Sequence, residues 1–226
     1  MKVSIIIPTM NEEASIGEVM DTIKDSMKNF EGDYEVLVVD TNSKDRTREI
    51  AAEKGAKIID EPRRGYGRAY KTGFEKAEGD IIATLDADCT YPAEDIPSLV
   101  KMLKEENLNF ITTDRLSKME KGAMSAKHRL GNWILKFTMN LLFRMRLKDS
   151  QSGMWVFKRE ILDKIELISD GMPLSEEIKI EAWRKGFSAK EVPIVYKRRK
   201  GEVKLQSWQD GFRNLRFLFR KRFRAH

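Results

Sequence analysis

Two carboxylates one residue apart are the side chains whose type and spacing most clearly indicate chemistry in this sequence. Asp86 and Asp88 follow residues 81–85, a short apolar run typical of a buried strand. Residues i and i+2 of an extended segment point to the same side, so both carboxylates are expected at one site beyond the end of the strand. Their mutual repulsion is relieved by a cation, and oxygen ligands of this kind suit Mg²⁺ or Mn²⁺. The pair predicts a metal site for a phosphorylated ligand, whereas a single Asp here would more simply cap a helix.

Polar residues also follow the two earlier strand-like segments. Residues 8–13 come after the apolar run at 3–7, and residues 40–43 come after the run at 35–39. An acid at the carboxyl end of a parallel strand commonly accepts hydrogen bonds from a ribose or a base. This position predicts a nucleoside contact for Asp40.

A third candidate is the basic, glycine-containing loop at residues 63–70. Its backbone N–H groups and arginines could face an anion. The spacing is not the dinucleotide fingerprint, because Tyr70 replaces the third glycine and the loop follows the third strand. The histidines, His128 and His226, are too far apart to suggest a histidine metal site or a catalytic triad. The single cysteine, Cys89, excludes an internal disulfide.

Strand-like and helical patterns alternate through the first half of the chain. Short, nearly continuous apolar strands joined by helical crossovers predict an α/β fold with a mostly parallel sheet covered by helices on both faces. Asn11 and Ser43 are expected to cap the first two helices. The segments expected as strands are 3–7, 35–39, 56–59, 80–85, 110–113, 155–157 and 191–196, and those expected as helices are 12–29, 44–54, 65–78, 92–106, 132–147, 174–185 and 207–223.

Composition is that of one globular domain with a charged surface, since 41% of the 226 residues are apolar and 35% are charged. The chain has no apolar run long enough to span a bilayer and no charged-then-apolar leader, which predicts a cytoplasmic protein. Its positive charge is concentrated at the C-terminus: residues 197–226 hold eleven Lys/Arg and two acids, a net charge of +9, against +6 for the whole chain. This tail predicts an anionic partner.

The last helical segment is amphipathic. Phe212, Leu215, Phe219 and Phe223 recur at helical spacing, with Leu218 beside them, and arginines fill many of the other positions. The pattern is typical of a helix lying in an anionic lipid interface, although a helix that packs on its own domain has it too. A nucleic-acid-binding tail is an alternative, but no recognition motif accompanies the charge, and no nucleic-acid partner is expected.

The ordered set of motifs resembles family 2 glycosyltransferases of the GT-A, Rossmann-like fold. The likeness is greatest to polyprenyl-phosphate sugar synthases of the dolichol-phosphate mannose synthase type without a transmembrane domain, and it covers most of the chain. The segments that carry the resemblance are Pro8 with Asn11 and Glu12, Asp40, Gly65 and Gly67 with Ala69 and Tyr70, Asp86 with Asp88, residues 149–153 and residues 191–194.

The resemblance implies an inverting, metal-dependent transfer of a hexosyl group to dolichyl or polyprenyl phosphate. The donor would be GDP-mannose or a UDP-sugar such as UDP-glucose or UDP-GlcNAc. Two departures leave the base and the sugar open: Asp40 is followed by Thr41 where relatives have a second Asp, and residues 113–115 replace Gly-Ser-Arg. Residues 1–226 would form one domain, with a nucleotide-sugar half at 1–113, an acceptor half at 114–206 and a basic helix at 207–226 on the cytoplasmic face of a membrane.

Roles for individual residues are also implied by the resemblance. The catalytic residues would be Asp88, Arg115 and Glu176, and the metal would be held by Asp86, Asp88 and Thr90. The nucleotide sugar would contact Pro8, Glu12, Asp40, Asp86 and Asp88, and the acceptor phosphate would contact Arg115, Arg129, Arg198 and Lys204.

The chemistry suits a chain without an obvious catalytic histidine. A lipid phosphate is already ionised near neutral pH, so its oxygen can attack an anomeric carbon without a dedicated base. A metal-dependent nucleotidyltransferase is the alternative enzyme class. It would need a basic, glycine-rich loop after the first strand, and residues 8–11 are not such a loop.

Overall fold

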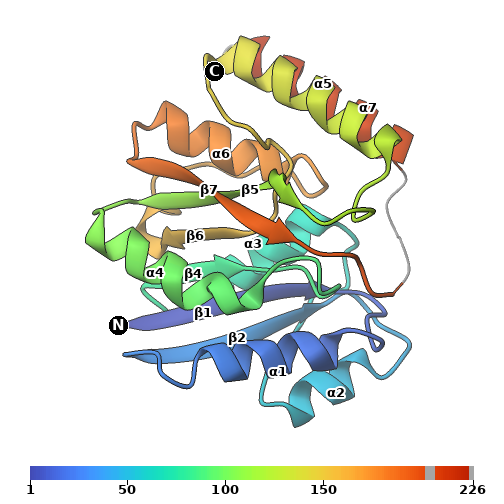
Figure 1. The fold of residues 1–226 in the computed structure, drawn as a ribbon, viewed down its shortest axis with the longest axis vertical. Helices are drawn as coiled ribbons and strands as arrows, with labels where there is room; N and C mark the ends of the chain where they lie inside the picture. The colour runs from blue at the N-terminus through green and yellow to red at the C-terminus, as the bar shows by residue number, and fades with distance from the viewer. Residues whose placement is uncertain (202–206, 224–226) are drawn as a thin grey trace.

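The computed structural model describes residues 1–201 and 207–223, which form one seven-stranded sheet flanked by helices (Figure 1). Its strands are β1 (Lys2–Thr9), β2 (Asp33–Asp40), β3 (Lys57–Asp60), β4 (Ile81–Thr84), β5 (Phe110–Met119), β6 (Trp155–Lys158) and β7 (Ala189–Tyr196). The order across the sheet is β3-β2-β1-β4-β6-β5-β7. Only β6 runs antiparallel to its neighbours, so the prediction of a mostly parallel α/β sheet is confirmed.

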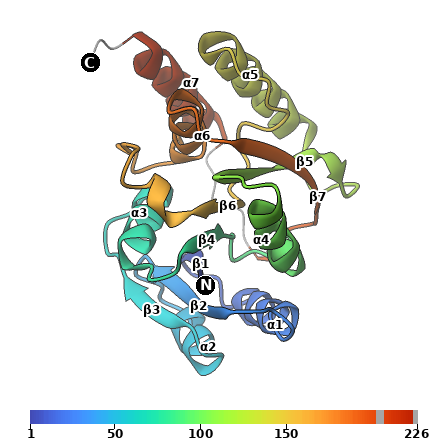
Figure 2. The same ribbon diagram turned by 90° about the vertical axis from the view of Figure 1, so that its left-hand side faces the viewer.

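Helices cover both faces of this sheet. They are α1 (Ile16–Ser26), α2 (Thr47–Glu53), α3 (Tyr66–Lys76), α4 (Ile96–Glu105), α5 (Ala126–Phe143), α6 (Leu174–Arg184) and α7 (Ser207–Phe223), with short 3₁₀ turns at Ala93–Asp95 and Arg159–Ile161. Figure 2 shows α1 and α4 on one face and α3 and α6 on the other. None of the helices in the described part of the chain combines the length and apolar character needed to cross a membrane.

Alternation along the strands divides the core between the two faces. In β1, Val3, Ile5 and Ile7 pack with α1 and α4, whereas Ile6 packs with α3 and α6. Successive side chains of a strand point to opposite faces, and here both faces are covered, so all four are fully buried. This double burial explains why the strands read as continuous apolar runs in the sequence.

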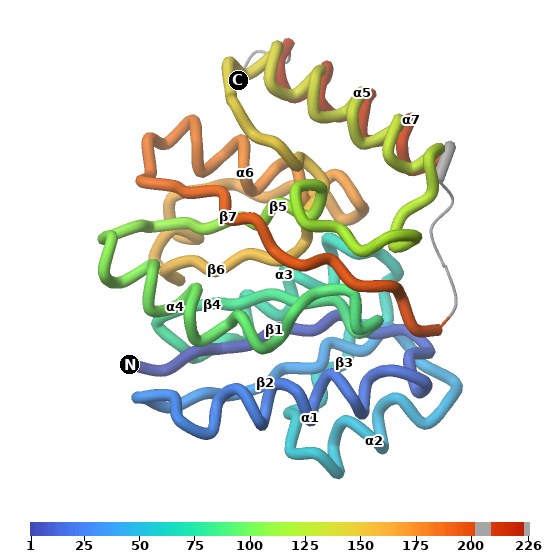
Figure 3. Tube along the Cα trace, viewed as in Figure 1, coloured from blue at the N-terminus to red at the C-terminus, as the bar shows by residue number. Residues whose placement is uncertain are grey.

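Helices α5 and α7 lie side by side beyond the β5–β7 end of the sheet, far from the N-terminus (Figure 3). Leu135 and Met139 of α5 form a small core with Leu218 of α7 and Ile180 of α6. The ammonium of Lys221 lies between two acids of α6, 3.0 Å from Glu177 and 2.8 Å from Glu181. Helix α7 is therefore docked on the domain by apolar and ionic contacts.

The loops after β1 and β2 differ from the expectation. Asn11 and Ser43 do not cap helices, because α1 begins at Ile16 and α2 at Thr47. The side-chain oxygen of Asn11 instead accepts a hydrogen bond from the backbone of Lys44 at 2.7 Å, and Ser43 accepts one from the backbone of Asn11 at 2.8 Å. The capping prediction was wrong: these side chains join the two loops into one wall.

Candidate active site

Two cavities lie at the edge where β1, β2 and β4 end. The first, here named the sheet cavity, has a volume of 730 Å³ and is lined by the ends of those strands, residues 169–173 and one side of α7. The second, the helix cavity, has a volume of 420 Å³ and lies against α5 and α7. The two cavities share four lining residues, which are Asp88, Met172, Arg199 and Asp210.

Asp88 stands at this junction with both carboxylate oxygens engaged. Its Oδ1 accepts hydrogen bonds from the backbone N of Thr90 at 3.0 Å and from the Thr90 hydroxyl at 2.6 Å. Its Oδ2 lies 3.1 Å from a terminal nitrogen of Arg199. The carboxylate is thereby held in one orientation at the end of β4, where the sequence predicted it.

Asp86 lines the sheet cavity beside it. Burial raises the pKa of Asp86 to about 7, and the negative charge of Asp88 adds to the effect, whereas the guanidinium of Arg199 opposes it. The hydroxyls of Tyr66 and Tyr70 lie 3.4 Å from its Oδ1. A divalent cation placed between the two carboxylates would favour their ionised forms and so offset both the burial and the repulsion that raise the pKa of Asp86.

The donor set fits Mg²⁺ or Mn²⁺ bound together with a phosphate. Asp86 and Asp88 supply carboxylate oxygens, whereas the Thr90 hydroxyl is bonded to Asp88 and so orients this carboxylate. The described residues contain no group of three or more His, Cys, Asp or Glu side chains able to hold a metal. The remaining ligands would be water and phosphate oxygens, as is usual for Mg²⁺.

The segment after β7 brings Arg199 into the site. Arg199 lines both cavities, and its second terminal nitrogen lies 3.5 Å from Glu12, a buried acid that also lines the sheet cavity. Arg198, the arginine expected at the acceptor phosphate, instead donates to the backbone oxygen of Lys121 at 2.8 and 3.0 Å and lines neither cavity. Lys204, expected in the same role, lies outside the described residues.

Arg115 forms the floor of the helix cavity. Its Nε and one terminal nitrogen bind both oxygens of Asp149, at 2.7 and 2.9 Å, and its guanidinium lies over the ring of Tyr196. Burial disfavours the ionised Asp149 carboxyl, but the charge of Arg115 outweighs burial and lowers the pKa of Asp149 to about 2. Arg115 is therefore a fixed cation with one edge toward the cavity.

Glu176 lies behind the wall of the site. It is fully buried and lines neither cavity, and its Oε1 accepts a hydrogen bond from the amide of Gln151 at 2.7 Å. Gln151 lines the helix cavity and accepts a hydrogen bond from Asn214 of α7 at 2.8 Å. Burial raises the pKa of Glu176 to about 8. Glu176 thus reaches the site only through Gln151.

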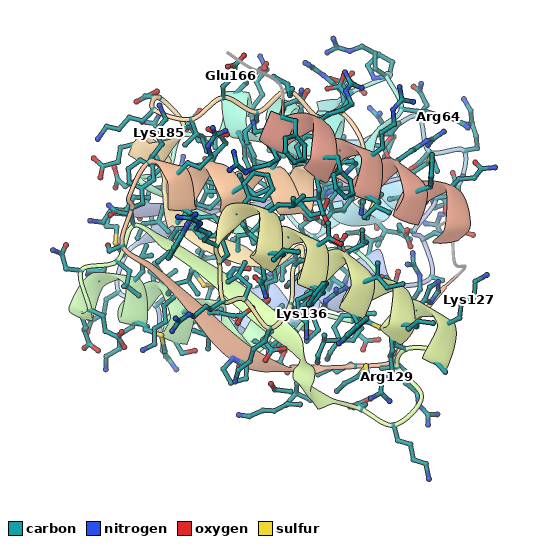
Figure 4. All side chains as sticks on the ribbon, turned by 90° about the horizontal axis from the view of Figure 1, so that it is seen from above. Arg64, Lys127, Arg129, Lys136, Glu166 and Lys185 are labelled. Atoms are coloured by element: carbon teal, nitrogen blue, oxygen red, sulfur yellow. The ribbon has the colours of Figure 1, made fainter. Side chains whose placement is uncertain are left out.

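Other expected residues fall in three places. Pro8 and Glu12 line the sheet cavity. Asp40 does not: its buried carboxylate is bonded to Thr9, Ser43 and Arg48, and its neighbour Thr41 faces the cavity. Arg129 is exposed on α5 (Figure 4) and lines neither cavity, although Lys127 and His128 line the helix cavity.

The basic loop at residues 63–70 uses its glycines for close packing. A Cβ at Gly65 would lie 2.2 Å from the backbone oxygen of Asp170, and one at Gly67 would lie 2.5 Å from that of Ser169. Arg64 alone among the arginines of this loop lines the sheet cavity, because Arg63 and Arg68 bind Glu61. The glycines therefore permit contact between two loops that wall the cavity.

Helix α7 adds residues that sequence reasoning did not assign to the site. Arg213, Arg216 and Arg220 recur at helical spacing and line the sheet cavity. The expected apolar stripe of α7 is split: Leu218 is buried against α5 and α6, whereas Phe212, Phe219 and Phe223 are exposed. The spacing of the three arginines along the sequence could have placed them on one side of the helix, but it could not have shown that this side faces the sheet cavity.

The sequence is similar to known glycosyltransferases along most of its length. A low-salt glycan biosynthesis hexosyltransferase of Haloferax volcanii is 38% identical over 217 residues, or 95% of this chain, and the chain spans about half (52%) of that relative. A dolichyl-phosphate hexose transferase of the same organism is 32% identical over 92% of this chain and 88% of its own length. A dolichol-phosphate mannosyltransferase of Pyrococcus furiosus is 32% identical over 97% of this chain and 63% of its own length.

The fold also has solved counterparts. Glucosyl-3-phosphoglycerate synthase from Mycobacterium tuberculosis, in complex with Mn²⁺, uridine diphosphate and phosphoglyceric acid, matches with a TM-score of 0.78 and 20% identity, over 98% of this chain and 78% of that one. The description "Glycosyl transferase family 2" belongs to the family model that matches residues 4–166. With that match over most of the chain and the relatives above, the protein belongs to glycosyl transferase family 2.

Proposed function

We propose that the protein transfers a hexosyl group from a nucleotide sugar to the phosphate of a dolichyl or polyprenyl lipid, with inversion at the anomeric carbon. The observation that carries the proposal is the meeting of two different cavities at Asp88 and Arg199. One cavity holds the acidic pair, and the other is walled by apolar side chains of two helices. The names of the relatives from Haloferax volcanii and Pyrococcus furiosus support a lipid-phosphate acceptor.

The sheet cavity suits the nucleotide sugar. Its volume is within the range of small-molecule sites, and it lies at the carboxyl ends of parallel strands, where α/β proteins bind nucleotides. Asp86 and Asp88 would hold Mg²⁺ or Mn²⁺ on the diphosphate, and Arg64 and Arg213 supply positive charge to phosphate oxygens. The nucleoside would meet Pro8, Thr9 and Thr41, while Asp40 supports that wall from behind.

The helix cavity suits the head of an isoprenoid phosphate. Leu130, Ile134 and Leu135 of α5 face Phe212 and Leu215 of α7 across it. Its floor is polar and carries Thr90, Arg115 and Arg199. The apolar isoprenoid chain would lie between the two helices, and its phosphate would lie against the arginines of the floor. Each part of the ligand would then contact side chains of matching polarity or opposite charge.

The residues of the chain then have distinct tasks in the reaction. An ionised acceptor phosphate needs orientation more than a base, and Arg115, fixed by Asp149, provides that orientation. A bound divalent cation would neutralise charge on the departing diphosphate. Arg199 lines both cavities, so it would lie between the two phosphates and could stabilise negative charge that moves from one to the other.

The exposed aromatic side chains fit a peripheral membrane location on the cytoplasmic face. Trp133 and Phe137 stack on the outer side of α5, and Phe219 and Phe223 stack on α7. Each of the four is at least 46% exposed. Lys136 is carried by the same helix as Trp133 and Phe137 (Figure 4), and aromatic and basic residues on one helix are the composition of an interfacial helix on an anionic leaflet.

The direct test is transfer to a polyprenyl phosphate from GDP-mannose, UDP-glucose or UDP-GlcNAc with Mn²⁺ or Mg²⁺. Gly131 of α5 lines the helix cavity with no atom within 4 Å of an added Cβ, so Gly131→Phe can fill the cavity without a backbone clash. Glycosyl-lipid formation should fall at least about tenfold in Gly131→Phe, while Gly131→Ala should stay near wild type and nucleotide binding should be unchanged in both. Unimpaired transfer by folded Gly131→Phe would show that the acceptor does not bind in this cavity.

A further inference from the structure

The resemblance to family 2 enzymes gave Arg199 no role, although it assigned the adjacent Arg198 to the acceptor phosphate. Its guanidinium lies between Asp88, at 3.1 Å, and Glu12, at 3.5 Å. The chain holds it there from both sides, because the backbone N of Lys200 donates to the backbone oxygen of Asp88 at 2.9 Å and that of Lys197 donates to Thr90 at 3.0 Å. Arg199 is thus set beside the acidic pair by main-chain contacts.

The charge balance makes this guanidinium important. Glu12, Asp86 and Asp88 all line the sheet cavity, and Arg199 bridges two of them. Arg115, the other arginine near the pair, is already bound to Asp149. Without Arg199, the acidic cluster would lose its nearest ion-pair partner among the described side chains, and a cluster of uncompensated carboxylates attracts cations.

The guanidinium also has an unused donor. The Nε of Arg199 is buried and has no hydrogen-bond partner, which is costly for a charged group. Arg199 lines both cavities, so a phosphate oxygen entering either one could approach it. A planar guanidinium binds phosphate through two parallel N–H groups, a geometry that the pair with Asp88 does not use fully.

We propose that Arg199 is a built-in counter-cation that competes with the divalent metal for Asp88 and moves to a phosphate oxygen when the nucleotide binds. The free protein then binds the metal weakly, and nucleotide and metal strengthen each other's binding, because the nucleotide removes the competitor. The release to phosphate rests on the proposed function, whereas the competition for Asp88 does not.

The experiment is a titration of the protein with Mn²⁺ alone, followed through the paramagnetic resonance signal of the free ion. Arg199→Gln should bind Mn²⁺ at least about tenfold more tightly than wild type. Arg199→Lys keeps the charge and should stay within about threefold. Lys200→Gln is the matched control, because it also removes one positive charge from this segment, but the ammonium of Lys200 pairs with Glu18 and not with the acidic pair. Asp88→Asn in the Arg199→Gln background should abolish the gain, which locates the ion.

A second titration with Mn²⁺ at saturating GDP or UDP measures the coupling. Wild type should bind Mn²⁺ at least about tenfold more tightly with the nucleotide than without. The ratio for Arg199→Gln should be clearly smaller, because the diphosphate still supplies metal ligands but no longer removes a competitor, and an equal ratio in the two proteins would overturn the release to phosphate. Three results would each overturn the proposal. The first is that Arg199→Gln binds Mn²⁺ alone no more tightly than Lys200→Gln does. The second is that the gain in affinity survives Asp88→Asn, and the third is that no variant binds Mn²⁺. If no variant binds either nucleotide, the proposed function fails, and the titration with Mn²⁺ alone still decides the role of Arg199. Thermal unfolding of each variant confirms that it is folded.

Discussion

The pair of Arg115 and Asp149 gives the sharpest test of how the site is built. Asp149 is fully buried and accepts four hydrogen bonds, from the backbone N, Nε and one terminal nitrogen of Arg115 and from the backbone N of Gln151. Asp149→Asn preserves the shape but replaces one acceptor oxygen by a donor that faces N–H groups. Two charge-assisted hydrogen bonds are lost and Arg115 stays buried without its counter-charge, so the free energy of unfolding should fall by about 3–5 kcal/mol.

A second estimate comes from the pKa of Asp149. Its shift from 3.8 to about 2 means that the folded protein favours the ionised carboxyl by about 2 kcal/mol relative to the protonated form. Because the folded pKa is lowered, this stabilisation is present above pH 3.8 and is lost as the pH falls toward 2. The effect of Asp149→Asn on stability should therefore shrink over the same pH range.

Urea denaturation of Asp149→Asn, Arg115→Met and the double variant measures the pair directly. The double-mutant cycle should give a coupling energy of at least about 2 kcal/mol, because removing either partner alone leaves the other buried and unpaired. Transfer assays on Asp149→Asn should show a raised KM for the lipid phosphate and an unchanged KM for the nucleotide sugar. A coupling energy below about 0.5 kcal/mol would refute the assignment of Asp149 as the group that fixes Arg115.

Three further predictions concern the acids and the outer face. Asp88→Asn should lower transfer at least about a hundredfold and stay folded, because relief of the repulsion from Asp86 offsets part of the lost ion pair with Arg199, which keeps Glu12 as a partner; near-wild-type transfer by the folded variant would exclude a metal role. Glu176→Gln should keep most transfer activity and raise the free energy of unfolding by on the order of 1–3 kcal/mol at pH 8 but not at pH 4. The reason is that between pH 4.5 and about 8 the carboxyl of Glu176 ionises only in the unfolded protein, so the stability of the wild type falls over that range. An equal change in stability at both pH values, measured by urea denaturation, would contradict this. Phe219→Ser with Phe223→Ser should weaken co-sedimentation with anionic vesicles at least about tenfold, whereas Trp183→Ser on α6 should not, and equal losses would argue against a specific membrane face.

The sheet and the acidic pair could be predicted because their signals are local. A strand covered on both faces must be apolar throughout, and β1, β2 and β4 are read directly from that requirement. Asp86 and Asp88 lie just beyond the carboxyl end of β4 as predicted, but β4 ends at Thr84 and residues 87–88 form a turn, so strand alternation is not what brings the two carboxylates together. The likeness to family 2 enzymes needed only the order of these motifs along the chain, and the family model confirms it.

The exact side chains that face the cavities could not be read from the sequence. Arg198 and Arg199 are adjacent and equally basic, and their directions depend on backbone hydrogen bonds from the segment after β7 to Asp88 and Thr90. No pattern in the sequence predicts these hydrogen bonds. Asp40 lies at the expected strand end, but Arg48 and Thr9 turn its carboxylate into a structural acceptor. Long-range contacts decide both cases.

The orientation of α7 is the clearest example of tertiary packing overriding a sequence pattern. Apolar residues at 212, 215, 218, 219 and 223 form a broad stripe and Phe217 lies apart from it, so the sequence does not decide which part of the stripe faces the domain. The choice is made by Leu218, which fills the small core with α5 and α6, and by Lys221, which binds two acids of α6. Phe219 and Phe223 are then directed away from the domain.

This orientation gives α7 three tasks on three sides, and it changes how an experiment on the helix must be designed. Arg216 and Arg220 wall the sheet cavity, Leu215 lines the helix cavity, and Phe219 faces outward. Deleting residues 207–226 would open both cavities and remove the outer aromatic face together, so a loss of transfer would not show which task had failed. Substitutions on single sides separate them: Arg216→Gln should weaken nucleotide binding alone, whereas the exchange of outer phenylalanines should weaken vesicle binding alone. Under the proposed function, a helix that must satisfy all three sides at once would couple membrane binding to the integrity of the two cavities.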